Sequence, residues 1–170
     1  MTNIAAKDPD VVFCPIYYGE AGLAITAARQ AGCTATFLGG DGFGSVKDYA
    51  SAEDLEGTVY CSGYAPGTES VAQFEKDYCE TYKVDTVPNM FAPLAYDAAM
   101  LMACGLKAAE DKGLTAGTDE YKQAVIEAIN TMNGVEGVTG SYSFDEYNNP
   151  IKSVAIIELT NGEEAFKEMY

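Results

Sequence analysis

VVFCPIYYGEAGLAITAARQAGCTATFLGGDGFG, residues 11–44, alternates short apolar runs with a segment rich in small residues. Val11–Cys14 is a continuous apolar run, typical of a strand that is buried on both faces. An alanine-rich helix is predicted over residues 20–31, and Gly32 terminates it. A second strand follows at Thr34–Leu38. The order strand, helix, strand predicts a parallel sheet with a crossover helix.

The chain then continues with a third strand and three helices. The strand is predicted at Thr58–Ser62. Apolar residues at helical spacing predict helices that begin near Thr68 or Ser70, after Pro88 and near Thr118. In the second helix we expect these residues to face inward: Leu94, Ala98, Leu101, Met102 and Leu106.

Two strands are predicted at the C-terminal end. Residues 139–144 and 151–159 are expected to pair around a turn at residues 145–150, and a polar tail begins at Asn161. The predicted fold class is therefore α/β: a parallel-sheet, Rossmann-like lobe with a C-terminal strand pair.

Composition and charge restrict the classes of function. The 170 residues include 26 Asp and Glu, 10 Lys and Arg and no His, which gives a formal net charge of −16. Nucleic acids and anionic membranes are polyanions, so we expect neither as a partner. The absence of His excludes Ser-His-Asp and Cys-His catalysis and His-ligated metals. We therefore expect a protein that is not an enzyme and needs no metal or cofactor.

The five cysteines contain no CxxC spacing, and their odd number does not indicate a disulfide framework. We expect free, mostly buried thiols. They are Cys14, Cys33, Cys61, Cys79 and Cys104.

The chain shows no targeting signal, because its first residues are neither basic nor continuously apolar. The stretch Phe91–Ala109 is apolar enough to resemble a membrane span. Asp97 lies near its middle, so we predict a buried helix instead.

Ligands of open parallel sheets bind outside the carboxyl ends of the strands. Three loops leave such ends, at residues 15–19, 39–45 and 63–68. They contain four aromatic residues and one central carboxylate: Tyr17, Tyr18, Phe43, Tyr64 and Asp41. Aromatic walls around one carboxylate suit a small ligand with a cation and an apolar body, such as an α-amino acid.

These residues also have purely structural interpretations. An aspartate between glycines, such as Asp41, is commonly a turn or helix-cap residue. Tyr17 and Tyr18 could be packing residues whose hydroxyls lie at the surface. The glycine run at residues 39–44 does not match G-x-G-x-x-G and follows the second strand, so we interpret it as a turn.

Several segments together resemble a known family, in order along nearly the whole chain. They are residues 6–13 (AKDPDVVF), 17–22 (YYGEAG), 27–32 (AARQAG), 38–42 (LGGDG), 95–99 (AYDAA) and 137–145 (GVTGSYSFD). This pattern is similar to the C-terminal portion of branched-chain amino-acid (Leu/Ile/Val) substrate-binding proteins of ABC transporters. That family has the type I periplasmic-binding fold, in which two α/β lobes enclose a ligand in a cleft.

The resemblance implies roles for particular residues. Tyr17 would lie over the ligand side chain, Asp41 would pair with its α-ammonium group, and Phe91 would be a wall residue donated by the other lobe. Tyr18, Gly42 and Tyr64 would be their neighbours. Asp41 is one methylene shorter than the Glu that some members carry, so the ligand could be larger or more polar than leucine.

The resemblance also implies a division of the chain. Residues 1–64 and 150–170 would belong to the second lobe, and the mainly helical residues 65–149 to the first lobe, whose upstream part lies outside this chain. We expect the fragment to form one compact unit, and a homodimer through its exposed helices is an alternative. Half a cleft leaves the Asp41 ion pair in water, where it is worth at most about 1 kcal/mol. We therefore expect no tight amino-acid binding by this chain alone.

The implied function is solute binding for an ABC importer. An amino acid and an ABC permease would be the partners, and the parent protein would be periplasmic or an extracellular lipoprotein. The alternative is the ligand-sensing domain of a receptor or regulator with the same fold.

Overall fold

The computed structural model describes residues 1–170, and its larger sheet has five strands. They are β1 (Val11–Cys14), β2 (Thr36–Gly39), β3 (Val59–Ser62), β7 (Ala155–Thr160) and β8 (Glu163–Met169). The order is β1-β2-β3-β7-β8, with β1 to β3 parallel and β7 and β8 antiparallel to their neighbours. The predicted α/β fold with a parallel sheet is confirmed.

Short helices and one long helix complete this part of the molecule. Helix α1 (Thr2–Ala5) precedes β1, and α2 (Tyr18–Gln30) connects β1 to β2. Three short helices lie between β2 and β3: η1 (Asp41–Phe43), η2 (Val46–Asp48) and α3 (Ala52–Leu55). We call residues 1–62 and 155–170 the α/β lobe.

The remaining elements lie in residues 69–151, which we call the helical half. They are η3 (Glu69–Val71), α4 (Ala72–Tyr82), α5 (Phe91–Asp111), α6 (Asp119–Asn130), β4 (Val135–Gly137), β5 (Gly140–Phe144) and β6 (Pro150–Ile151). The strands form a separate antiparallel sheet in the order β4-β5-β6. Thr118 caps α6 by accepting a 3.2 Å hydrogen bond from the Tyr121 N–H, so the expected start of this helix is confirmed.

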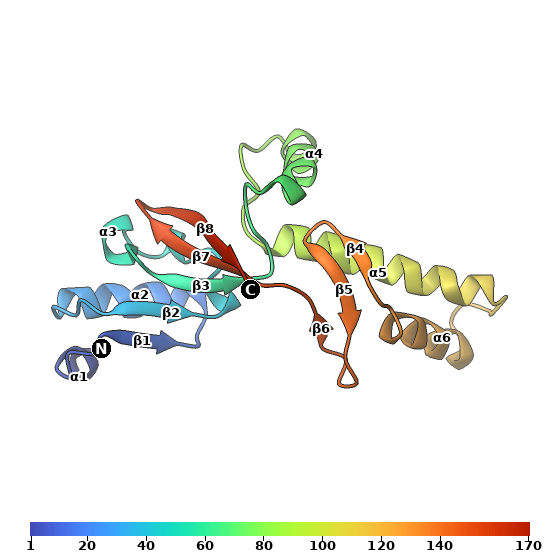
Figure 1. The fold of residues 1–170 in the computed structure, drawn as a ribbon, viewed down its shortest axis with the longest axis horizontal. Coiled ribbons are helices and arrows are strands. Elements are labelled where there is room, and N and C mark those ends of the chain that lie inside the picture. Colours follow the sequence, from blue (N-terminus) through green and yellow to red (C-terminus); the bar gives the residue numbers. More distant parts are fainter.

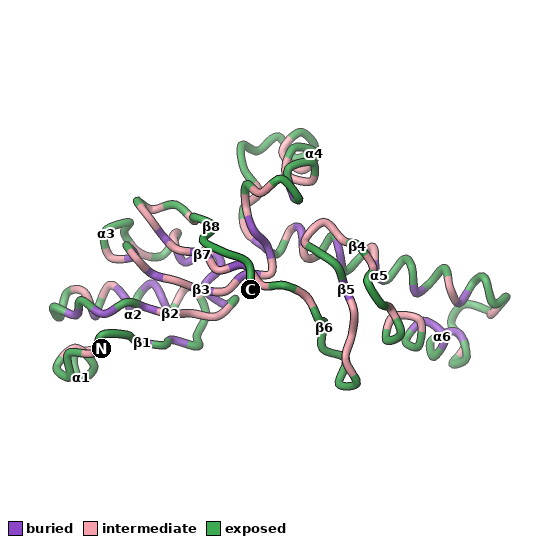
Figure 2. The backbone as a smooth tube through the Cα atoms, viewed as in Figure 1, coloured by how far each residue is buried: buried purple, intermediate pink, exposed green.

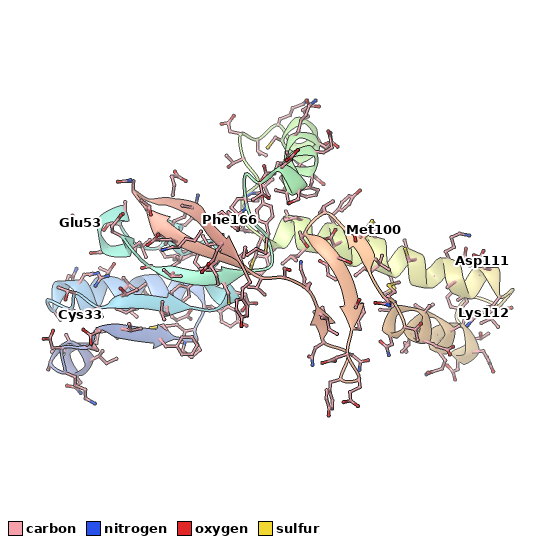
Figure 3. The ribbon with its side chains drawn as sticks, in the orientation of Figure 1. Cys33, Glu53, Met100, Asp111, Lys112 and Phe166 are labelled. Atoms are coloured by element: carbon pink, nitrogen blue, oxygen red, sulfur yellow. The ribbon has the colours of Figure 1, made fainter.

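The two parts are joined end to end by a first connecting segment, residues 63–68, and a second connecting segment, residues 152–154, which gives an elongated molecule (Figure 1). Cys33 lies near one end, and Asp111 and Lys112 lie at the opposite end (Figure 3). The main core fills the α/β lobe, whereas smaller clusters lie between α5 and α6 and around Tyr64 and Met90. Buried residues therefore occur in separate groups along the molecule (Figure 2).

The C-terminal strands differ from the expected pair. Only Pro150–Ile151 pairs with β5, and the chain then crosses to the α/β lobe, where Ala155 pairs with Ser62 of β3. The chain thus changes from the smaller sheet to the larger one between Ile151 and Ala155. Burial explains the crossing, because alternate residues of β7 (Ala155, Ile157 and Leu159) fill the main core. The polar tail forms the edge strand β8, where charged residues are typical.

Two apolar faces have no covering layer. In β1, Val12 and Cys14 are buried under α2, but Phe13 is 67% exposed, so this strand is not buried on both faces as predicted. In α5, only Leu101 of the five residues expected to face inward is buried, and Met102 is 47% exposed. Helix α6 packs along α5, and the exposed side chains of Met102 and Leu106 show that part of the apolar surface of α5 stays uncovered. No helix of the structure combines the length and the hydropathy that a membrane crossing requires.

All five cysteines are free. Cys14 and Cys33 are buried, Cys61 and Cys79 are half-buried, and Cys104 is exposed. No disulfide therefore constrains the junction between the α/β lobe and the helical half.

Candidate ligand-binding site

Two loops at the carboxyl ends of β1 and β2 form a shallow pocket of about 190 Å³. It is lined by Pro15, Ile16, Tyr17, Gly40, Asp41 and Gly42. The structure thus brings together three of the residues singled out in the sequence, Tyr17, Asp41 and Gly42. Their position agrees with the rule that open parallel sheets bind ligands at the carboxyl edge.

The two loops touch each other because residue 42 is a glycine. A Cβ atom at Gly42 would lie 2.9 Å from the carbonyl oxygen of Ile16 and 3.3 Å from Cδ1 of Tyr17. The first loop is turned by a 2.9 Å hydrogen bond from the Ile16 N–H to the Cys14 carbonyl. Gly42 therefore acts in the pocket through close backbone packing rather than through polar chemistry.

Asp41 presents a carboxylate without a partner. It is exposed, it begins η1, and its side chain forms no hydrogen bond or ion pair. The helix-cap interpretation would require this carboxylate to accept a backbone N–H, which it does not do. The ring of Tyr17 beside it is 70% exposed, and its hydroxyl has no hydrogen-bond partner either. The pocket thus offers a negative charge next to an open aromatic face.

Tyr18 and Tyr64 lie outside this pocket. The ring of Tyr18 packs on Tyr49, with ring centroids 5.2 Å apart, and contacts the main core. Tyr64 is buried and donates a hydrogen bond from its hydroxyl to Glu75, whose Oε1 also accepts the Gly67 N–H at 2.9 Å. Burial, with the Glu75 carboxylate adding to it, raises the pKa of Tyr64 well above its ordinary value. In this structure Tyr64 fixes the first connecting segment to α4.

Phe91 is the first residue of α5 and is 45% exposed, but it does not line the pocket. Its N–H donates a 3.0 Å hydrogen bond to Oδ1 of Asn89, and Nδ2 of Asn89 donates to Oγ of Ser45 at 3.3 Å. Ser45 follows Asp41 by four residues. Asn89 therefore ties the start of α5 to the loop that carries Asp41.

Sequence reasoning missed Asn89 and Ser45. The sequence carries no signal for them. Ser45 adopts a left-handed conformation, with φ of 77°, which is uncommon for a residue other than glycine and which a serine in the sequence does not indicate.

A larger cavity, about 750 Å³, lies elsewhere, between α4 and α5. Its walls include Phe74, Tyr78 and Tyr82 at helical spacing on α4, and Tyr96 on α5. Phe74 and Tyr96 meet edge to face, with centroids 5.4 Å apart. The one carboxylate in the lining, Asp77, already accepts a 2.7 Å hydrogen bond from Gln73. This groove is an aromatic helix face with a single carboxylate, which is hydrogen-bonded within α4.

Residues 1–164 match the family model described as "Periplasmic binding protein", so the chain belongs to this family of binding proteins. A curated relative, the Leu/Ile/Val-binding protein homolog 3 of Brucella melitensis, is 24% identical over 148 residues, which cover 86% of this chain and 38% of the relative.

Solved structures show the same relationship. A leucine binding protein, LivK of Thermotoga maritima, superposes with a TM-score of 0.83 and 26% identity over 99% of this chain and 47% of its own. The branched-chain amino acid transporter substrate binding protein LivJ of Streptococcus pneumoniae, in complex with isoleucine, superposes with a TM-score of 0.78 and 29% identity. The match covers 99% of this chain and 46% of LivJ. A solute binding protein from R. palustris in complex with benzoate shares the fold, with a TM-score of 0.75 and 22% identity over 98% and 44%. The chain spans less than half the length of each of these proteins.

Proposed function

We propose that this chain supplies one half of the ligand cleft of a solute-binding component of an ABC importer. The ligand is an amino acid, branched-chain or related. The observation that carries the proposal is the unpaired carboxylate of Asp41 beside the exposed ring of Tyr17, at the carboxyl edge of the sheet. Asp41 binds the α-ammonium group, because an opposite charge is the simplest partner for an open carboxylate. Tyr17 covers the apolar side chain of the ligand.

The division of the chain between two lobes is part of the proposal. The α/β lobe belongs to the second lobe of the full receptor, and the helical half belongs to the first. Two observations support this division. Part of the apolar surface of α5 is uncovered, and the chain spans less than half the length of its relatives. Phe91, on the helical half, then faces the ligand from the lobe opposite Asp41.

The class of ligand follows from the charge of the pocket. One relative is described in complex with isoleucine, and a more distant structure in complex with benzoate, which carries no ammonium group. Without a partner for Asp41, an anion such as benzoate would lie against an uncompensated negative charge. An amino acid supplies the missing cation. The permease of the importer is the partner, and the site of action is periplasmic or extracellular.

Calorimetric titration of a longer protein that contains these 170 residues with leucine, isoleucine and valine tests the proposal. Asp41→Ala should abolish binding while circular dichroism stays unchanged. Asp48→Ala is the matched control, since Asp48 is also exposed and unpaired but lies outside the pocket. Equal affinity in the Asp41→Ala and Asp48→Ala proteins would show that Asp41 does not bind the ammonium group.

A further inference from the structure

Lys152 lies in the second connecting segment, where the chain returns from the helical half to the α/β lobe. Its ammonium group donates a 3.0 Å hydrogen bond to the carbonyl oxygen of Gly63, which belongs to the first connecting segment. It also donates to Oγ1 of Thr139 at 2.6 Å and to the hydroxyl of Tyr142 at 3.2 Å. One side chain thus links both connecting segments to each other and to the β4–β5 hairpin.

The hairpin is in turn fixed to α5 by Asp97, which is fully buried. The Asp97 carboxylate accepts the backbone N–H groups of Val138 and Thr139 at 2.7 and 2.9 Å. It also accepts hydrogen bonds from the hydroxyls of Thr139 and Tyr142, at 2.6 and 3.0 Å. These two hydroxyls therefore donate to Asp97 and accept from Lys152, so they connect a buried negative charge to a half-buried positive one.

This network leaves Lys152 no capacity for a ligand. An ammonium group has three protons, and all three have acceptors within the protein. A polar cavity of about 370 Å³ adjoins Lys152 and includes Ser141, Ser143 and Ser153 in its lining, but it has no free cation to hold an anion. Lys152 also lies 4.7 Å from the centroid of the Tyr142 ring. The contacts of this lysine are those of a cross-link rather than of a binding residue.

Few other side-chain hydrogen bonds link the α/β lobe to the helical half. Ser45 accepts a hydrogen bond from Asn89, and Oγ of Ser62 donates to the sulfur of Met90 at 3.4 Å. Both contacts lie at the start of α5. Among the side-chain hydrogen bonds, only that of Lys152 joins the two connecting segments to each other.

We propose that Lys152 is a positioning residue that fixes the angle between the α/β lobe and the helical half. If the proposed function holds, this angle sets the position of Phe91 relative to Tyr17 and Asp41, so Lys152 presets the geometry of the cleft. Beyond the Ser62–Ala155 pair of β3 and β7, removal of its ammonium group breaks the side-chain hydrogen bond between the two connecting segments, and it leaves Asp97 without its compensating charge.

Small-angle X-ray scattering and hydrogen exchange of the 170-residue chain test this role without any ligand. In Lys152→Met, which keeps the length of the side chain, we expect a broader distribution of interatomic distances than in the unmodified chain. We also expect exchange at the Val138 and Thr139 amides to be faster by roughly tenfold or more. Lys107→Met is the matched control, because Lys107 is exposed and pairs only with Asp111 on the same helix. It should change neither measurement.

A second variant keeps the test decisive if Lys152→Met does not fold. Thr139→Val removes one of the two hydroxyls that bridge Lys152 and Asp97 and leaves both charges in place, and it should produce the same changes in smaller degree. Scattering and exchange identical to those of the unmodified chain, in whichever of the two variants folds, would overturn the role of Lys152. Because neither measurement involves an amino acid, this result is distinguishable from a failure of the proposed function.

Discussion

The hydroxyl of Thr58 is fully buried and has no hydrogen-bond partner. A buried polar group without a partner costs about 1–3 kcal/mol of desolvation. Valine has nearly the same shape and no hydroxyl. We therefore expect Thr58→Val to raise the free energy of unfolding by about 1 kcal/mol, measured by urea denaturation. Thr58→Ser, which keeps the hydroxyl and loses the methyl group, should lower it. Destabilisation by valine would contradict this account.

At the same scale, sequence reasoning located part of the candidate site. Tyr17, Asp41 and Gly42 share a pocket because their two loops leave the carboxyl ends of parallel strands, and these ends lie at one edge of the sheet. The rule does not say which way a side chain points, and Tyr64 turns inward to Glu75 instead. Lys152 could not be found in this way, because its contact with Gly63 joins residues 89 positions apart.

Among the elements, α2 passes close to the segment after η2 at Gly22. Replacing glycine by alanine inside a helix normally stabilises it by about 1 kcal/mol. At Gly22 the added Cβ would lie 2.6 Å from Cβ of Tyr49 and 2.8 Å from its carbonyl oxygen. We therefore expect Gly22→Ala to destabilise the chain by about 1–3 kcal/mol, seen as a lower melting temperature.

Gly19, one turn earlier in α2, is the matched control. A Cβ there would lie 3.7 Å from the nearest atom of Tyr49, which is an ordinary contact. Gly19→Ala should therefore leave the melting temperature unchanged or raise it. Equal responses of the two variants would mean that the close approach at Tyr49 relaxes without cost.

Element types were predictable where the signal is local, and strand pairing was not. The apolar runs at β1 and β3, and the Thr118 cap of α6, lie in short stretches of sequence. The partner of β7 depends instead on a non-local choice between β5, nearby in sequence, and β3, about 95 residues away. Burial of Ile157 and Leu159 in the main core favours β3, and no local pattern contains that information.

At the scale of the whole molecule, the hydrophobic clusters differ in size because the sheet and α5 are each covered only in part. A parallel sheet is stable when both of its faces are covered, and a helix when its apolar stripe is packed. Here α2 covers one face of the sheet and α6 one side of α5, which leaves Phe13 and Met102 exposed. The sequence contains the apolar residues for both layers, so it predicts burial that this chain cannot provide.

The two parts should therefore differ in stability. The α/β lobe has a continuous core that includes Phe37 and Ile157, whereas the cluster between α5 and α6 contains only four buried residues, among them Val125. Local unfolding occurs first where few apolar contacts are buried. Native-state hydrogen exchange should show amides of β2 and β7 protected roughly tenfold or more above those of α6, a difference of about 1.4 kcal/mol. Amides of α2, which is helical but packs on the larger core, separate the effect of core size from that of helical structure and should match the sheet. Equal protection in α2 and α6 would instead mean that the junction around Lys152 couples both parts into one cooperative unit.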